Sequence, residues 1–382
     1  MKRTEAQRSA LMMRMARILS GLFLLAFVTS HLLNLSLGVI SIEAMDNARP
    51  VLTGIWSNPV VGPILLLALI VHFILGLWSI YRRPTLQTNL QDSVQIVTGL
   101  LVIPLMATHV VGAASLGING VNFNYAVATK FFWLDQPQIG LLQVILLSIV
   151  WIHGCAGLFT WLRSREDMRS ILGWLYPVAV AVPVMALMGY AEAGRGVLID
   201  AQEARTSAPS YSENAPQTAT RTPPIIPYKV VKEVTNQIIW WSLGLAALTL
   251  AAREVRVRLH PFEHVQLKRG DCAPIATTSK LTVFDSFRIG NQPHAGLCEG
   301  RGRCGTCAVR ILASEFPLPQ PTALEIKTLS RIGADEDTRL ACQLTPSGGS
   351  VEVEPLYPAD YSFKDKDITE TAQPGTQPEL QT

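Results

Sequence analysis

Charge of either sign is scarce in this chain: only 16% of its 382 residues are Asp, Glu, Lys or Arg, and the formal net charge is +3. No basic patch interleaved with aromatic residues occurs, so the sequence does not indicate a nucleic-acid partner. A small-residue cleavage site is also missing after the basic start, and the first apolar run is too long for a secretory signal peptide. We therefore expect a retained first membrane span, with a cleaved signal peptide as the alternative.

Apolar sequence, in contrast, is abundant. Apolar residues make up 49% of the chain, and nearly all the long apolar runs precede Arg253. Several runs reach the roughly 20 residues that a helix needs to cross about 30 Å of hydrocarbon. We predict a membrane α-helical bundle of six transmembrane helices, near residues 16–40, 60–81, 94–117, 138–162, 171–190 and 236–252.

Basic residues in the short connections predict the orientation of the bundle. Arg82 and Arg83 follow the second span and Arg163 follows the fourth, whereas the connections at 41–59 and 118–137 hold one basic residue each. This distribution predicts a multi-pass protein of the cell inner (cytoplasmic) membrane, with both termini in the cytoplasm. Because the cytoplasm keeps thiols reduced, metal binding is a better expectation for the six cysteines than disulfides.

The composition changes twice along the rest of the chain. Segment 201–227 is rich in Ser, Thr, Ala and Pro, and we predict a disordered outer loop there. After Arg253, strand-like runs at 255–259, 308–312 and 351–353 and a short helix at 323–329 predict a compact soluble domain. The predicted division is a membrane domain over residues 1–253, a soluble domain over 254–360 and a disordered tail over 361–382.

Four histidines lie in four successive apolar spans, where hydrocarbon disfavours an unpaired imidazole. A single such histidine is more often a hydrogen-bonded structural residue or part of a proton relay than a metal ligand. Their depths, however, match in pairs. His72 and His153 each precede an arginine at the inner edge by ten residues, which places both about 15 Å from the inner boundary. His31 and His109 follow Arg17 and Asp92 and lie roughly 21–26 Å from that boundary.

Two such layers are what two stacked haems require, with each iron held by one imidazole from each of two helices. We predict that an outer pair, His31 and His109, binds one haem b, and that an inner pair, His72 and His153, binds the other. Glycines such as Gly76 would let a porphyrin lie against the helix backbone, although small residues also form packing seams in membrane bundles. Two imidazoles per iron leave no open site, which favours electron transfer over oxygen chemistry.

Short motifs surround the four histidines. They are Ser20-Gly21 ahead of Ser30-His31-Leu-Leu-Asn34, His72 with Gly76, Gln95-Ile-Val-Thr98-Gly99 ahead of His109, and His153 with Gly157-Leu158. Over about residues 15–190 the chain therefore resembles the dihaem cytochrome b anchor of succinate dehydrogenases and fumarate reductases. This resemblance implies the same haem pairing and an exchange of electrons with membrane quinone. The sixth span and the soluble domain depart from that anchor.

The soluble domain carries a Gly-rich loop in which Cys298, Cys304 and Cys307 have the spacing C-x5-C-x2-C, with Cys342 as a distant fourth thiol. Four thiolates suit a [2Fe–2S] cluster, and the loop glycines would aim backbone N–H groups at its sulfurs. A four-cysteine zinc site is the alternative, but such sites usually present two C-x2-C pairs. A Rieske centre needs two histidines, and His294 has no partner in the motif. The remaining thiols, Cys155 and Cys272, are assigned no ligand role.

The cysteine spacing and the final Leu-Ala-Cys342-Gln resemble the adrenodoxin-like ferredoxins over about residues 255–357. This resemblance implies a small α+β domain of the β-grasp type and carries the ligand role onto Cys298, Cys304, Cys307 and Cys342. A dihaem bundle followed by such a ferredoxin is similar to the N-terminal part of redox-responsive membrane adenylate cyclases. A cyclase domain follows in those proteins, whereas a polar tail follows here, so we expect no cyclase active site in this chain.

The leading hypothesis is a membrane electron-transfer protein that relays electrons between quinone, two b haems and a cytoplasmic [2Fe–2S] cluster. Such a protein would sit in membrane lipid, serve an unidentified cytoplasmic redox or signalling protein, and could belong to a quinone-linked oxidoreductase. The alternative is a redox sensor without a catalytic domain, in which the oxidation state of a cofactor changes the docking of a signalling partner. An inert anchor with a zinc-bound domain is the third hypothesis. No catalytic or quinone-binding residue is assigned.

Overall fold

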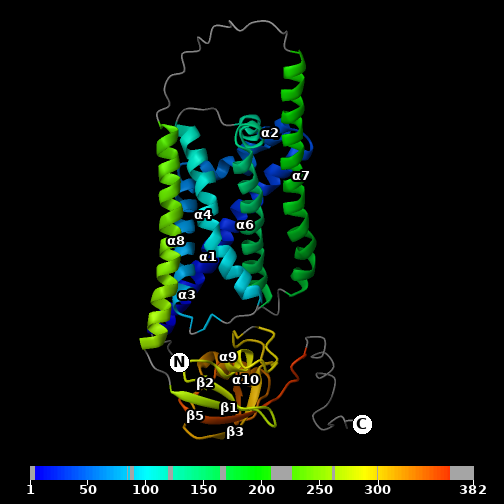
Figure 1. Ribbon diagram of the computed structural model, residues 1–382. Helices are drawn as coiled ribbons and strands as arrows, with labels where there is room; N and C mark the ends of the chain where they lie inside the picture. Colours follow the sequence, from blue (N-terminus) through cyan, green and yellow to red (C-terminus); the bar gives the residue numbers. More distant parts are fainter. Residues whose placement is uncertain are drawn as a thin grey trace. The chain divides into compact units, whose positions relative to one another are not determined.

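A computed structural model describes residues 5–83, 85–86, 90–118, 124–163, 169–207, 226–259, 263–298 and 300–361. The chain divides into two compact units. The first unit contains the long helices up to Glu254, and the second contains the strands and short helices that follow Val255 (Figure 1).

Six long helices make up most of the first unit: α1 (Glu5–Ser36), α3 (Val61–Tyr81), α4 (Leu90–Ile118), α6 (Pro137–Arg163), α7 (Arg169–Ser207) and α8 (Tyr228–Leu259). Each contains a stretch long and apolar enough to cross a membrane, which confirms the six apolar helices predicted for this part of the chain. Large apolar side chains remain exposed along all six helices. A helix that is apolar on most sides needs an apolar surrounding, so the helical unit is compatible with a multi-pass membrane protein.

Short helical segments join the long helices at the end where α1 finishes. They are η1 (Leu37–Val39), α2 (Ile42–Leu52), η2 (Gly54–Ser57), α5 (Tyr125–Lys130) and the π-helical turn η3 (Phe131–Asp135). The side chain of Ser41 caps α2 by accepting a hydrogen bond from the Ala44 N–H, and Asn124 caps α5 in the same way from Val127. Such caps satisfy N–H groups that the first turn of a helix leaves without a partner.

Two helices run beyond their predicted ends. Helix α7 continues to Ser207, so the first seven residues of the predicted disordered loop 201–227 are helical, while 208–225 lies outside the described residues. The extension contains Ala, Gln, Glu and Arg, which are good helix formers. Helix α8 ends at Leu259, so the strand predicted at 255–259 is wrong. Extending an existing helix needs no new nucleus, and this outweighs the alternation of apolar residues and arginine there.

Helix α1 packs against both α3 and α7. At its crossing with α7 the two backbones touch, because a Cβ atom on Gly189 would collide with the carbonyl of Leu35, and one on Gly38 would collide with the carbonyl of Gly189. Only glycine permits so close an approach. Beside this crossing, a buried cluster of Leu32, Leu147, Trp151, Val182 and Ala186 joins α1, α6 and α7.

In its described residues, the second unit is a mixed five-stranded sheet with two short helices. The strands β1 (His264–Lys268), β2 (Ile275–Thr278), β3 (Ala308–Ser314), β4 (Thr338–Leu340) and β5 (Gly349–Pro355) lie in the order β2-β1-β5-β3-β4. Strands β1 and β5 pair in parallel, and the other pairs are antiparallel. Helices α9 (Val283–Ile289) and α10 (Ala323–Arg331) complete the unit. The strands predicted at 308–312 and 351–353 and the helix predicted at 323–329 are confirmed.

Candidate metal centres

The Gly-rich loop of the second unit depends on glycine for its shape. Gly300, Gly302 and Gly305 have φ angles of 81°, 64° and 82°, in the left-handed region that residues with a Cβ atom rarely adopt. A Cβ on Gly302 would lie 2.9 Å from the side chain of Gln343, and one on Gly305 would lie 2.8 Å from Ile332. These φ angles and close contacts show a tightly wrapped loop.

The loop and the segment that follows β4 bring the four predicted thiols together. The Sγ atoms of Cys307 and Cys342 lie 3.3 Å apart, and Cys298 contacts both Cys304 and Cys342 through thiol hydrogen bonds. Cys298, Cys307 and Cys342 are buried, and Cys304 is partly exposed. The four sulfurs can thus bind one compact group whose edge reaches the surface at Cys304.

The thiols differ in acidity because they share their protons. Hydrogen bonds from Cys304 and Cys342, with further ones from the backbone N–H groups of Arg303 and Cys304, lower the pKa of Cys298. The pKa values of Cys304 and Cys342 are raised, first because these two thiols donate to Cys298 and further because burial disfavours their charged form. A bound cation is therefore required for all four to be thiolates together.

The number of thiols fits a [2Fe–2S] cluster, which spreads four cysteine ligands over two irons. Within the described ranges, no group of three or more His, Cys, Asp or Glu side chains is arranged to hold a single metal ion.

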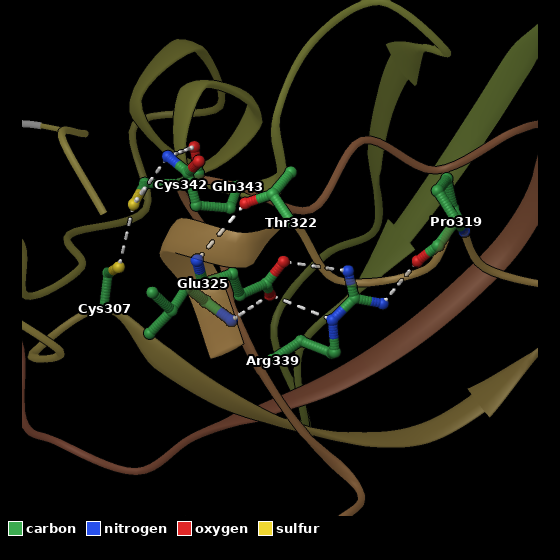
Figure 2. A network of polar contacts seen from close by, with 8 residues as sticks. Cys307, Pro319, Thr322, Glu325, Arg339, Cys342 and Gln343 are labelled. Atoms are coloured by element: carbon green, nitrogen blue, oxygen red, sulfur yellow. Dashed lines mark hydrogen bonds and ion pairs between the residues drawn. The ribbon is translucent and has the colours of Figure 1, made fainter. Parts of the chain in front are cut away.

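A buried ion pair lies next to the segment that carries the fourth cysteine (Figure 2). The carboxylate of Glu325, on α10, is fully buried and accepts hydrogen bonds from Arg339 Nε at 2.9 Å, Arg339 Nη2 at 3.1 Å and the Leu340 N–H at 2.9 Å. Arg339 also donates to the carbonyl of Pro319 at 2.8 Å. These bonds fix α10 to β4, and Cys342 follows that strand by two residues.

The sequence did not predict this ion pair. The run from Thr322 to Glu325 fits a capping box, which would keep the carboxylate at the exposed helix start. Thr322 does cap α10, because its hydroxyl accepts from the Glu325 N–H at 3.2 Å. The Glu325 carboxylate, however, points to Arg339, fourteen residues further along the chain.

The remaining cysteines and His294 lie away from a ligand position. Cys272 is exposed, and Cys155 is partly buried beside the apolar cluster of α1, α6 and α7. The ring of His294 packs on Phe287 with ring centres 4.8 Å apart, and its Nε2 lies 3.4 Å from the carbonyl oxygen of Cys307. Burial lowers the pKa of His294 to about 4, so this loop residue is a neutral neighbour of the thiols.

In the helical unit, the four predicted histidines lie in two pairs. The ring centres of the outer pair, His31 and His109, are 6.0 Å apart, and those of the inner pair, His72 and His153, are 6.1 Å apart. Two imidazoles that bind one metal from opposite sides through bonds of about 2 Å place their ring centres roughly 6 Å apart. Each pair therefore has the spacing that a shared metal requires.

Three of the four rings use Nδ1 for a hydrogen bond within the protein. His72 Nδ1 lies 3.1 Å from the carbonyl oxygen of Arg17, and His153 Nδ1 lies 3.1 Å from that of Gln95. His109 Nδ1 lies 2.8 Å from Gln143 Oε1. A metal-binding histidine typically donates its second ring N–H to such an acceptor, which leaves Nε2 for the metal. The ligand assignment itself stays a prediction.

Comparison with known proteins concerns the second unit. Residues 284–347 match the family described as the 2Fe-2S iron-sulfur cluster binding domain, and this range includes all four cysteines of the site. A segment of 44 residues is 48% identical to Ferredoxin-1 of Aquifex aeolicus (strain VF5). The segment covers 11% of this chain and 46% of that ferredoxin, so the chain spans about half the length of this relative. The C-terminal region therefore contains a [2Fe–2S] ferredoxin domain with the capacity for electron transfer.

Proposed function

We propose that this chain is a membrane electron-transfer protein that connects membrane quinone with a cytoplasmic redox or signalling partner. In this proposal the inner and outer histidine pairs each hold one haem b, and Cys298, Cys304, Cys307 and Cys342 hold the [2Fe–2S] cluster. The observation that carries the proposal is the spacing of about 6 Å within both histidine pairs. Bound haem and cluster supply reversible one-electron chemistry.

The histidine pairs have no equally good structural explanation. An imidazole in an apolar bundle needs partners for both ring nitrogens. In both members of the inner pair, backbone carbonyls serve Nδ1 alone. When Nδ1 carries the proton in both rings, both Nε2 atoms are acceptors, so neither ring can donate a hydrogen bond to the other. A metal between the rings binds both Nε2 atoms at once.

The cysteine site suits a cluster that changes charge. Backbone N–H groups of Arg303 and Cys304 point to the Cys298 sulfur and stabilise negative charge there. The partly exposed Cys304 gives an electron a short route to a docked protein. Zinc has no redox chemistry, so a zinc site would explain neither the N–H groups at Cys298 nor the exposure of Cys304.

The six apolar helices support a membrane location, and the basic residues in the connections after the second and fourth spans support an orientation with the ferredoxin domain in the cytoplasm. In that orientation the domain can meet soluble partners while the histidine pairs stay within the lipid.

The first test is the cofactor content of the purified full chain. We expect two b haems and one [2Fe–2S] cluster per chain by visible and EPR spectroscopy. His72→Ala should remove one haem signal, and Cys304→Ala should remove the cluster signal. The matched controls are His264→Ala and Cys272→Ser, because both residues are exposed. A wild-type protein without porphyrin would overturn the haem assignment.

The second test separates electron transfer from sensing. An anaerobic quinol analogue should reduce both haems and then the cluster of the full chain, and an added electron acceptor should sustain turnover. Haem bands that never reduce would overturn the proposal. Redox-dependent binding of a protein partner without any sustained turnover would replace it with the sensor hypothesis.

A further inference from the structure

The inner histidines rest against two nearly identical sites on neighbouring helices. On α1, the carbonyl oxygen of Arg17 lies 3.1 Å and the hydroxyl of Ser20 lies 3.3 Å from His72 Nδ1. A Cβ atom on Gly21 would lie 2.7 Å from Cε1 of the same ring. We call this set of carbonyl, hydroxyl and glycine a histidine cradle.

The second cradle lies on α4. The carbonyl oxygen of Gln95 lies 3.1 Å and the hydroxyl of Thr98 lies 3.4 Å from His153 Nδ1. A Cβ atom on Gly99 would lie 2.7 Å from Cε1 of His153. All three contacts thus recur at the same positions of the helix and at nearly the same distances.

The hydroxyl groups determine where the proton of each ring sits. Ser20 Oγ lies 2.7 Å from the carbonyl oxygen of Ala16, and Thr98 Oγ1 lies 2.6 Å from that of Val94. A hydroxyl has a single hydrogen, and these short bonds use it. Each hydroxyl can therefore only accept a hydrogen bond from the ring, and so can the carbonyl beside it. Since Nδ1 faces two acceptors, it must carry the proton.

The cradles also lie at the same distance along the sequence from the outer histidines. Each glycine is followed ten residues later by a histidine of the outer pair, His31 on α1 and His109 on α4. Helices α1 and α3 carry one outer and one inner histidine, and α4 and α6 carry the other two. Each pair therefore takes one ring from each two-helix unit.

We propose that the two cradles are positioning sites that hold both inner histidines as the Nδ1–H form with Nε2 directed to a shared metal, and that α1–α3 and α4–α6 are two copies of one two-helix unit. The nature of the metal group rests on the proposed function. An acceptor at Nδ1–H makes an imidazole a stronger donor to its metal, so the cradles contribute equally to the stability of the oxidised inner site.

The test is a redox titration of the full chain, read by the EPR signals of the two haems. Ser20→Ala and Thr98→Val each remove one acceptor, so both should raise the midpoint potential of the inner haem alone and by similar amounts. The conservative variants Ser20→Thr and Thr98→Ser should restore the wild-type potential. Thr249→Ala is the matched control, because Thr249 makes the same bond to the carbonyl of Leu245 on α8, which carries no histidine.

A steric variant gives a second readout. Gly99→Ala should displace the ring of His153 and remove the inner haem, while the outer haem and the cluster persist and show that the chain is folded. The proposed role of the cradles would be refuted if the midpoint potential of the inner haem stayed unchanged in both Ser20→Ala and Thr98→Val. An equal shift of the midpoint potential of the outer haem would refute it too. A wild-type chain that binds no haem would instead overturn the proposed function, so the two failures are distinguishable.

Discussion

Glu325→Gln is expected to destabilise the ferredoxin domain strongly. The wild-type carboxylate has no exposed surface and accepts three hydrogen bonds, two of them from the guanidinium of Arg339. Glutamine keeps the size of the side chain but removes its charge. Its NH₂ group would face N–H donors of Arg339 or Leu340, and the Arg339 charge, whose side chain is only 11% exposed, would lose its counter-ion.

Removing one partner of a buried ion pair typically reduces the free energy of unfolding by about 3–5 kcal/mol. That is a large part of the roughly 5–15 kcal/mol by which a domain is stable. For a domain of this size, with an m-value near 1.3 kcal/mol per molar urea, the unfolding midpoint should fall by roughly 2–4 M. The same change should loosen β4 and release the cluster earlier, because Cys342 follows that strand.

The assay follows the visible circular dichroism of the cluster in the detergent-solubilised full chain against urea. Arg310→Gln is the matched control: its ion pairs with Asp337 and Glu354 are exposed and should contribute only about 0–1 kcal/mol. The double variant Glu325→Gln with Arg339→Met should recover part of the loss, because no unpaired charge then remains buried. A Glu325→Gln midpoint equal to that of Arg310→Gln would refute the reasoning.

Three further predictions test other sites. Gly305→Ala should lower the urea midpoint of the cluster signal more than Gly300→Ala. Both glycines have a φ above 80°, but a Cβ on Gly305 would collide with Ile332 at 2.8 Å, whereas one on Gly300 would make ordinary contact at 3.9 Å. Equal effects would contradict this. Gly189→Ala should lower the melting temperature of the solubilised chain, whereas Gly173→Ala, which opens onto free space, should not. Burial raises the pKa of Tyr125 from 10.0 to about 12, so the stability that it contributes is complete below pH 10 and lost as the pH rises to 12. Tyr125→Phe should remove that alkaline loss in pH-dependent melting curves, and an unchanged curve would contradict the assignment.

The helices and the main strands were predictable because each depends on a property of a short run of residues. A stretch of about 20 apolar residues has few other uses than crossing a membrane. Equal distances from a charged helix end indicated which histidines lie at one level, and the structure places those rings together. The cysteine spacing indicated the cluster loop for the same reason, since a short Gly-rich loop holds its three thiols close in any fold.

The ends of the helices and the buried ion pair were not predictable in this way. Whether α8 stops at Arg253 or continues to Leu259 depends on the balance between helix extension and strand pairing, and the alternation of valine and arginine favours the wrong choice. The burial of Glu325 depends on Arg339, which a local pattern does not contain. A carboxylate near a helix start indicates a cap, and only the tertiary partner shows that it lies in the core.

The cradles also correct the spacing of the two histidine layers. The sequence-based depths took Arg17 as the inner boundary and implied that the layers differ by about 10 Å or less. The structure instead shows the carbonyl of Arg17 bound to His72, so Arg17 lies at the level of the inner pair. The cradle glycine Gly21 lies at that level too, and His31 follows it by ten residues, which is a rise of about 15 Å along α1. The same ten residues separate Gly99 from His109 on α4. Since two helices give the same larger value independently, the two histidine layers lie about 15 Å apart along the helices, which is further than the charged helix ends indicated.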